Sequence, residues 1–307
     1  MKIFVTGVGG QLGHDVIERL VSRDIECIGS DIQKTWGDGV SDEIKKNVCY
    51  VPLDITDKAL VSSTITALNP DAVIHCAAWT AVDAAEEEKN KLKVESINVD
   101  GTKNIAHVCK QINAKMMYIS TDYVFNGCGD TPWKPDCKDY APLNFYGKTK
   151  LDGELAVSSM LDNYFIVRIA WVFGINGNNF IKTMVNLSKS HKELKIVDDQ
   201  IGSPTFTYDL ARLLCDMIIT EKYGYYHATN EGAYISWADF ATEVFKQIGA
   251  DVKIHRVSTK EYGQSLAARP YNSRLDKTKL IECGFEPLPD WKGAVKRYLI
   301  SAGFINS

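Results

Sequence analysis

The sequence has no long apolar run, no excess of positive charge and no paired-cysteine motif. No stretch approaches the roughly 18 uninterrupted apolar residues that cross a bilayer, so we expect no membrane partner. The net charge is -4 and no local run of Lys and Arg offsets it, which predicts that nucleic acid is not a partner. These absences favour a globular protein that acts on small molecules.

The eight cysteines are scattered, with no Cys-x-x-Cys pair and no His at zinc spacing. We interpret them as reduced thiols. The chain also enters a strand-like run at Ile3 without a charged leader or an apolar signal core. Both observations predict a cytoplasmic protein.

The first half alternates short apolar runs with helical spacing. Strands are predicted at Ile3–Thr6, Ile25–Ser30, Asn47–Leu53, Ala72–Cys76, Lys115–Ser120 and Tyr164–Trp171, with helices at Gln11–Ser22, Lys58–Leu68, Val94–Gln111 and around Tyr146. Such alternation is typical of parallel strands joined by right-handed crossovers. It predicts an α/β fold with a doubly wound parallel sheet of the Rossmann kind.

After Gly174 the pattern becomes irregular, with a loop at 175–179, a helix at Phe180–Ser188 and a turn-rich passage at 198–204. We therefore predict a dinucleotide-binding domain over 1–174 and a smaller α+β substrate-binding lobe over 175–307. Residues 223–230 contain a strand-like run that is expected to return to the sheet of the first domain. The two parts are thus expected to be interleaved.

A glycine-rich turn follows the first predicted strand and opens a helix, with Gln11 and Leu12 between its last glycines. In Gly7-x-x-Gly10-x-x-Gly13, the glycines are expected to allow the tight turn, the approach of backbone to a pyrophosphate, and close packing of helix on strand. The alternative is a turn without a ligand. Its place in the first crossover favours a dinucleotide site.

Further cofactor-binding residues are expected where later strands end. Asp31 is positioned to bond the adenosine ribose and so favours NADH, whereas Lys34 can meet a 2′-phosphate and so favours NADPH. Asp54, followed by Ile55, is expected at the adenine edge, or alternatively as the cap of the next helix. The small residues of Cys76-Ala77-Ala78 suit backbone lying against a cofactor, or simple tight packing.

Three candidate catalytic residues are Thr121, at the end of a strand, and Tyr146 and Lys150 on the next helix. A Tyr-x-x-x-Lys spacing alone is weak, since about one such pair is expected by chance. In a helix the two side chains share one face. Two unit charges 4 Å apart interact by about 4 kcal/mol at an effective dielectric of 20, so Lys150 is expected to lower the pKa of the Tyr146 phenol toward 7.

These residues resemble the extended short-chain dehydrogenases and, within them, the dTDP-4-dehydrorhamnose reductase family. The resemblance covers nearly the whole chain. Besides the glycine turn and the Tyr-Lys pair, its narrower motifs are Ser120-Thr121-Asp122-Tyr123-Val124-Phe125, Asp199-Gln200-Ile201-Gly202-Ser203-Pro204-Thr205 and Arg269-Pro270-Tyr271-Asn272-Ser273. Many relatives have Asn where this chain has Cys76.

The resemblance implies an NAD(P)H-dependent reductase of the C4 ketone of a dTDP-6-deoxy-hexulose, giving dTDP-L-rhamnose for cell-surface polysaccharide. It implies that Tyr146 donates the proton, Lys150 holds the nicotinamide ribose and Thr121 bonds the ketone. The residues expected to contact substrate are Thr80, Val82, Asp122, Tyr123 and Trp171, and Arg269 is expected to bind phosphate unless it forms a surface ion pair.

The resemblance also raises a possible homodimer with Mg²⁺ held between subunits. Asp15 and Glu193 fall near the acidic positions used for such an ion, although we expect them to be solvated surface carboxylates.

Two other functions remain open at this point. One is a related nucleotide-sugar enzyme, either another 4-reductase or an epimerase, and only the epimerase would retain its cofactor. The other is a noncatalytic regulatory subunit like that of methionine adenosyltransferase, against which the presence of Thr121, Tyr146 and Lys150 together argues.

Overall fold

The computed structural model describes residues 1–37, 40–263 and 265–306. Its centre is a parallel sheet of seven strands in the order β11-β6-β5-β4-β1-β2-β3. The strands are β1 (Ile3–Thr6), β2 (Cys27–Asp31), β3 (Cys49–Pro52), β4 (Ala72–His75), β5 (Lys115–Thr121), β6 (Tyr164–Ile169) and β11 (Gly224–His227). The predicted doubly wound fold is confirmed, and the expected strands differ from these bounds by a few residues at their ends.

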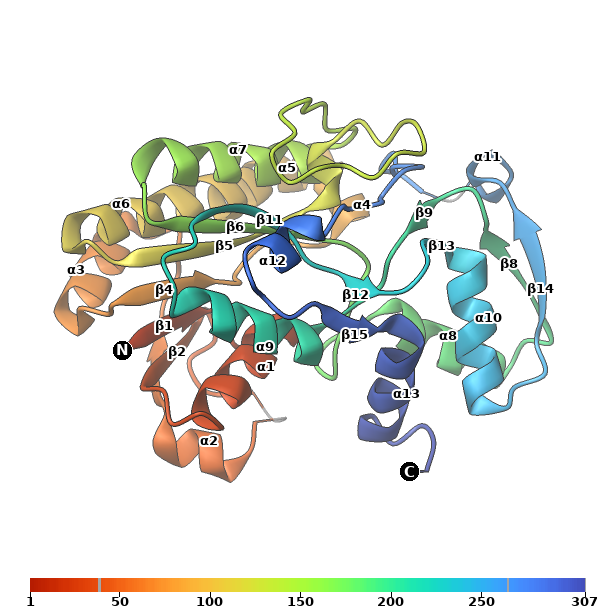
Figure 1. The fold of residues 1–307 in the computed structure, drawn as a ribbon, viewed down its shortest axis with the longest axis horizontal. Coiled ribbons are helices and arrows are strands. Elements are labelled where there is room, and N and C mark those ends of the chain that lie inside the picture. The colour runs from red at the N-terminus through yellow and green to blue at the C-terminus, as the bar shows by residue number, and fades with distance from the viewer. Residues whose placement is uncertain (38–39, 264, 307) are drawn as a thin grey trace.

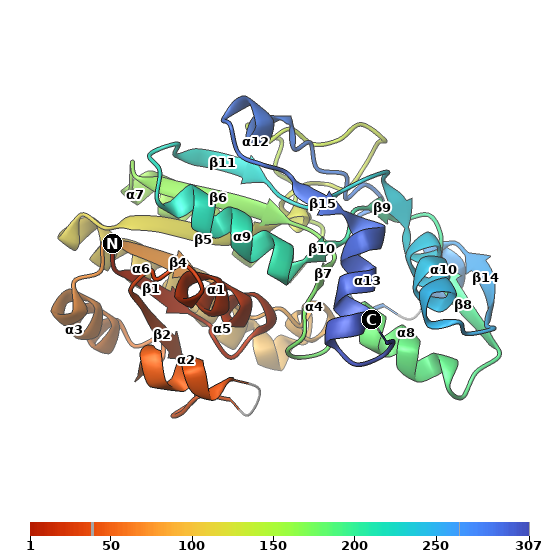
Figure 2. The same ribbon diagram turned by 60° about the horizontal axis from the view of Figure 1, so that its bottom comes forward.

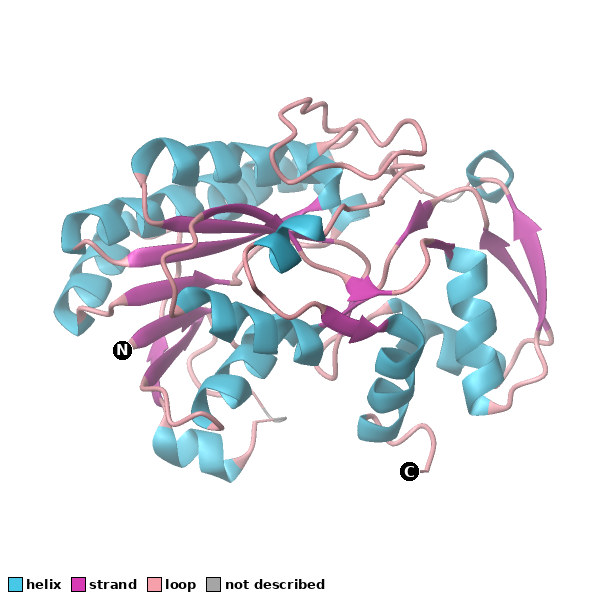
Figure 3. Cartoon of the chain, viewed as in Figure 1, coloured by secondary structure: helices cyan, strands magenta, loops and turns pink. Residues whose placement is uncertain are grey.

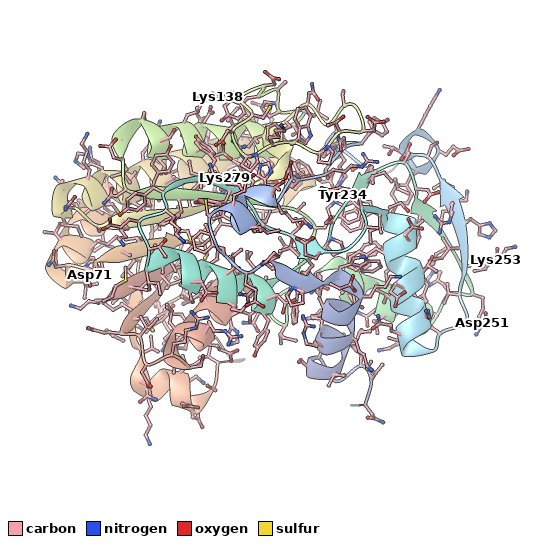
Figure 4. All side chains as sticks on the ribbon, viewed as in Figure 1. Asp71, Lys138, Tyr234, Asp251, Lys253 and Lys279 are labelled. Atoms are coloured by element: carbon pink, nitrogen blue, oxygen red, sulfur yellow. The ribbon has the colours of Figure 1, made fainter. Side chains whose placement is uncertain are left out.

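Helices cover both faces of this sheet (Figures 1 and 2). One face packs against α1 (Gln11–Val21), α2 (Asp42–Asn47) and α9 (Thr207–Ile218), and the other against α3 (Lys58–Leu68), α6 (Thr102–Ile112) and α7 (Phe145–Met160). Central strands such as β1 and β4 are buried on both faces and consist mainly of apolar residues, as is typical of parallel sheets. Charged side chains such as Asp71, Lys138 and Lys253 lie at the periphery (Figure 4).

The predicted helix Val94–Gln111 is longer and less regular than expected. It begins as α5 (Glu88–Glu95), passes through a π-helical turn, η1 (Ser96–Gly101), and continues as α6. The residues of the turn include Asn98, Asp100 and Gly101, which are poor helix formers. A π turn inside a helix is uncommon and often marks a functional position.

The second half of the chain builds a separate core and also extends the sheet. Helices α8 (Phe180–Ser188), α10 (Trp237–Ile248) and α13 (Trp291–Ser301) pack together in that core, on the right of Figure 1. β8 (Glu193–Val197) pairs in parallel with β14 (Lys253–Val257) beside them. β11 instead pairs in parallel with β6 in the large sheet, so the polypeptide crosses between the two parts.

The remaining elements are short. They are α4 (Val82–Ala85), the 3-10 turn η2 (Asp122–Val124), α11 (Thr259–Tyr262), α12 (Thr278–Glu282), β7 (Val172–Phe173), β9 (Ile201–Gly202), β10 (Thr205–Phe206), β12 (Asn230–Glu231), β13 (Ile235–Ser236) and β15 (Leu288–Asp290). A long loop, 125–144, connects η2 to α7 and lies over the top of the view in Figure 3. None of the helices in the described part of the chain is long and apolar enough to cross a membrane.

A fully buried ion pair fixes α7 on the sheet. Arg168 of β6 donates to both carboxylate oxygens of Glu154 on α7, at 2.8 and 2.7 Å, and neither side chain is exposed to solvent. The guanidinium also donates to the Pro135 carbonyl and the Tyr140 hydroxyl of the long loop, both at 3.1 Å. One side chain therefore holds the strand, the helix and the loop together.

We predict that Glu154→Leu destabilises the fold by about 3–5 kcal/mol, because it leaves the Arg168 guanidinium buried without a counter-charge. Urea denaturation measures this loss. Replacing both partners, as Glu154→Leu with Arg168→Met, is expected to recover much of it, because no buried charge then remains. A double variant no more stable than the single one would contradict this account of the pair.

Candidate active site

The glycine turn between β1 and α1 is shaped by contacts that no larger residue could make. Gly7 has φ +71°, and a Cβ there would lie 2.6 Å from the Ala77 nitrogen. A Cβ on Gly13 would lie 2.2 Å from the Gly7 carbonyl oxygen. Gly10 is the N-cap of α1 and provides no side-chain cap, so the first N–H groups of the helix are available to an anion. The turn thus fits a pyrophosphate.

Two adjoining cavities lie along the carboxyl edge of the sheet. The smaller, about 220 Å³, is lined by Asp31, Asp54, Ile55 and Ala77. The larger, about 410 Å³, contains the predicted catalytic residues Thr121, Tyr146 and Lys150. Gly7, Gly10, Cys76 and Ala78 line both cavities, so the two spaces meet at the glycine turn.

The larger cavity also contains most of the other residues expected in the site. Gln11, Leu12, Gly13, Thr80, Val82, Asp122, Tyr123 and Trp171 all line it. Trp171 has the unusual φ of +49° for a bulky residue, and its ring stacks on Trp237 at 3.8 Å. Strained backbone of this kind concentrates at functional sites.

Two of the predicted residues lie outside both cavities. Lys34 is exposed and lines neither of them, whereas Asp31 accepts the Gly9 N–H at 2.9 Å. Arg269 is paired with Asp83, with Nη2 2.7 Å from Oδ2, so the alternative of an ion pair is what the structure contains. The suggestion that Asp54 caps the next helix is wrong: Asp57 caps α3, and Asp54 instead accepts from Thr56.

The carboxylates considered for a metal have different partners within the chain. Glu193 on β8 contacts His255 at 2.5 Å. Asp15 is only 4% exposed, 3.3 Å from His14 on α1, so its expected place among solvated surface groups is wrong. His14, Asp15 and Glu18 each offer one ligand atom within 4.8 Å of the others, a set that does not include Glu193.

The hydroxyl groups at the end of β5 form a connected set. Thr121 donates from Oγ1 to Asp122 at 3.0 Å, and its hydroxyl is also hydrogen-bonded with the Tyr146 phenol. Burial raises the pKa of Asp122 to about 6. The Ser120 hydroxyl lies in the same cavity and is buried with no hydrogen-bond partner in the described part of the chain. The sequence analysis did not single out Ser120 as a site residue.

The expected effect of Lys150 on Tyr146 is not what the structure gives. Burial raises the pKa of the Tyr146 phenol, and the nearby Asp122 carboxylate raises it further, while the hydrogen bond with Thr121 lowers it. Burial also lowers the pKa of the Lys150 ammonium to about 7, although Glu154 raises it. Its Nζ lies 4.1 Å from the centre of the Tyr118 ring. Desolvation is the largest cause for both groups, and neither charge is among the causes that shift the pKa of the other group.

Asn98 is a further residue that the sequence analysis missed. From the π turn its Oδ1 accepts the Trp79 N–H at 2.8 Å, and its Nδ2 donates to the Thr149 hydroxyl of α7 at 3.0 Å. Thr149 in turn donates to the Tyr146 carbonyl at 2.9 Å. Asn98 thus ties the segment after β4 to the helix that carries Tyr146 and Lys150. Three poor helix formers among residues 98–101 were the available signal.

A parallel α/β sheet with a glycine turn at its first crossover, and Thr, Tyr and Lys side chains in the adjoining cavity, defines a dinucleotide-binding oxidoreductase of the short-chain dehydrogenase type. The family model described as RmlD substrate binding domain matches residues 1–303. The chain belongs to this family, that of the dTDP-4-dehydrorhamnose reductases.

Similar proteins match over almost their whole length. The dTDP-4-dehydrorhamnose reductase of Aggregatibacter actinomycetemcomitans is 36% identical over 309 residues, which cover 96% of this chain and 97% of the relative. The crystal structure of such a reductase from Clostridium acetobutylicum has a TM-score of 0.88 at 39% identity, covering 99% and 100% of the two chains. The Bacillus anthracis structure, in complex with NADP, has a TM-score of 0.87 at 36% identity, covering 98% and 99%.

The buried Lys150 predicts a pH dependence of stability. Its pKa in the folded protein, about 7, is lower than the ordinary 10.5, so between these values the unfolded chain binds more protons than the native one. Stability contributed by this group therefore rises with pH across that window. Relative to Lys150→Met, the wild-type protein is expected to gain several kcal/mol from pH 7 to 10, since each pKa unit is about 1.4 kcal/mol.

Urea denaturation of both proteins at several pH values measures this difference. Groups distant from Lys150 titrate in both proteins and cancel in the comparison, whereas His75 and Cys76, whose pKa values the Lys150 charge lowers, add a smaller difference. A constant difference in the free energy of unfolding between pH 7 and 10 would show that Lys150 is not desolvated as described.

Proposed function

We propose that this protein reduces the C4 ketone of dTDP-4-dehydro-L-rhamnose to dTDP-L-rhamnose, with NADPH or NADH as the reductant. The observation that carries the proposal is that one cavity contains both a pyrophosphate-binding turn and the Thr121, Tyr146 and Lys150 side chains. Its relatives, which match over almost the whole chain, are named for this reaction. The identity of the sugar that is reduced and the choice between NADPH and NADH are part of what we propose.

The cofactor rests on the fit of the glycine turn and the smaller cavity. The N–H groups at the start of α1 would bind the pyrophosphate, and Asp31 and Asp54 would face the adenosine half. When bound, the nicotinamide supplies the hydride that the substrate carbon C4 receives. A Bacillus anthracis relative was crystallised with NADP, which supports a cofactor of this class.

The side chains of the larger cavity would supply the proton, stabilise the developing charge and bind the substrate. The Tyr146 O–H would donate its proton to the oxygen of C4 as that carbon accepts the hydride, so that the ketone becomes an alcohol. The Thr121 hydroxyl would hydrogen-bond the same oxygen, and Lys150 would bind the nicotinamide ribose and offset the developing negative charge. Thr80, Val82, Asp122, Tyr123 and Trp171 would contact the sugar nucleotide.

Three other expectations stay predictions. Arg269 would have to exchange its Asp83 partner for phosphate in order to bind the diphosphate. The proposed steps require no metal ion, so the prediction of bound Mg²⁺ rests on the resemblance alone. The prediction of a homodimer rests on the resemblance in the same way.

The test is oxidation of NADPH or NADH on addition of dTDP-4-dehydro-L-rhamnose, followed by absorbance and by identification of the sugar product. One nucleotide oxidised per ketone reduced is expected. A tightly retained cofactor with sugar interconversion and no net oxidation would instead indicate an epimerase. No turnover of any nucleotide sugar would favour the noncatalytic alternative.

Tyr146→Phe is expected to lower kcat by a factor of about 100 or more, because the variant lacks the proton donor while keeping the ring. Steady-state kinetics and cofactor titration measure this, and the dissociation constant of the cofactor is expected to stay near that of the wild type. Tyr208→Phe, at an exposed position on α9, is the matched control and is expected to be fully active. Comparable kcat in the two variants would overturn the assignment of the proton donor.

Gly13→Ala is expected to weaken NADPH or NADH binding by about 10-fold or more, since the added Cβ would displace the Gly7 carbonyl and with it the pyrophosphate turn. Fluorescence titration of the reduced nucleotide measures the change. Gly37→Ala is the control, because a Cβ there would meet no atom of the described residues within 4 Å. Unchanged affinity in a folded Gly13→Ala protein would remove the turn from the cofactor site.

A further inference from the structure

Asn144 has two hydrogen bonds that face different parts of the molecule. It is the N-cap of α7, and its Oδ1 accepts the Gly147 N–H at 2.7 Å. Its Nδ2 donates to the Ala268 carbonyl, in the second half of the chain, at 2.8 Å. The side chain is only 7% exposed. Tyr146 lies two residues after this cap, in the first turn of the same helix.

The two bonds fix the orientation of the Asn144 amide together. An N–H donor such as that of Gly147 requires the amide oxygen, and a carbonyl such as that of Ala268 requires the amide NH₂. Rotation of the amide by half a turn would break both bonds. The bond to the Ala268 carbonyl therefore favours the amide orientation in which Oδ1 caps α7.

Ala268 belongs to a segment, Ser265–Pro270, that is anchored on α4. Asp83 of α4 accepts from the Ala267 N–H at 3.0 Å, from the Ser265 hydroxyl at 3.2 Å and from Arg269 at 2.7 Å. In this segment Ser265, Leu266 and Ala268 are exposed. Ala267 and Pro270 are buried, so the segment is held by these two side chains together with the polar contacts to Asp83.

Helix α4 contacts both the cavity and the start of α7. Its Val82 lines the larger cavity beside Tyr146. Glu86, which follows α4 directly, accepts the Phe145 N–H at 2.6 Å. The α4 region, segment Ser265–Pro270 and the first turn of α7 therefore form a closed ring of three contacts next to the reacting groups.

We propose that Asn144 is a positioning residue that couples the docking of segment Ser265–Pro270 on Asp83 to the placement of Tyr146. When the segment is docked, the Ala268 carbonyl holds the Asn144 amide so that the first turn of α7 is capped and the phenol is fixed. When the segment leaves α4, the cap loosens and the phenol loses its alignment. The kinetic consequence rests on the proposed function, whereas the structural coupling does not.

Alignment of the proton donor has a large effect on rate, because a displacement of about 1 Å can cost on the order of 100-fold. Loss of an N-cap, in contrast, has only a small effect on the stability of the fold. Substitution at Asn144 is therefore expected to affect kcat much more than it affects folding.

The decisive variant is Asn144→Ser. Serine can still accept the Gly147 N–H as an N-cap, but its short side chain cannot donate to the Ala268 carbonyl as well. We expect kcat for the dTDP-sugar to fall about 10-fold or more, with the dissociation constant of the reduced nucleotide and the melting temperature close to those of the wild type. Asn144→Ala, which loses both bonds, is expected to lose more activity and some stability.

Asp290→Ala is the matched control, since Asp290 caps α13 through the Lys292 and Gly293 N–H groups and lies outside both cavities. It is expected to lower the melting temperature while leaving kcat unchanged. Wild-type kcat in Asn144→Ser would overturn the proposal. So would an equal loss of kcat in Asn144→Ser and Asp290→Ala, which would reveal a general effect of lost caps.

A second measurement needs no substrate and so stands if the proposed reaction is wrong. Asp83→Asn weakens the anchor of the segment without changing α7 itself. Hydrogen exchange is expected to become faster in residues 265–270 and also in 145–148 in this variant, but not in Asp290→Ala. Faster exchange confined to 265–270 would show that the segment and the catalytic helix are not coupled.

Discussion

The buried pair of Arg168 and Glu154 is the interaction on which the arrangement of the site depends. Arg168 is on β6, which pairs with both β5 and β11, and its residue partner on β11 is His227. Its guanidinium lies over the rings of Phe125, Tyr140 and Tyr225, at 4.9, 5.3 and 4.8 Å from the ring centres. Such a cation is costly to bury unless it is fully paired, and Glu154 pairs it from α7.

Because Glu154 is one turn beyond Lys150, the same pair sets the rotation of the helix that carries Tyr146 and Lys150. The Arg168 side chain thus contacts the long loop through Pro135 and Tyr140, and it lies beside His227 of β11, the strand from the second half of the chain. The polar ring of Asp83, Asn144 and Glu86 acts at the other end of α7, where the helix begins. The helix that carries Tyr146 and Lys150 is thus fixed in the core by Glu154 and held at its first turn by polar contacts.

Much of the fold could be predicted from the sequence because its signals are local. Apolar runs bounded by turns specify the parallel strands, and a glycine turn directly after the first strand specifies the carboxyl edge. Residues at the carboxyl ends of these strands, such as Thr121 and Asp31, must then lie along that same edge. The roles of Trp171 and Val82 came from the resemblance, because no local pattern around them indicates contact with a ligand.

The interactions that the sequence did not predict are those between distant residues. Asp83 and Arg269 are 186 positions apart, and only the packed chain brings them together. Lys34 is three residues from Asp31 but is exposed and lines neither cavity, so its contact with a 2′-phosphate stays a prediction. The pKa of Tyr146 was predicted in the wrong direction because the charge of Lys150 was counted while the desolvation of both groups was not.

That raised pKa changes how the proposed chemistry is understood. A phenol with its pKa above the ordinary value stays protonated throughout the physiological range, so the proton donor for ketone reduction is always loaded. The reverse oxidation would need the phenolate as a base, which the burial of Tyr146 and the neighbouring Asp122 disfavour. Because the Lys150 pKa is about 7, its amine is only partly protonated at neutral pH. It can become fully protonated when negative charge develops beside it. The cavity therefore keeps the proposed proton donor in the form that reduction uses, and a bound cofactor does not have to lower the Tyr146 pKa for a proton to be available.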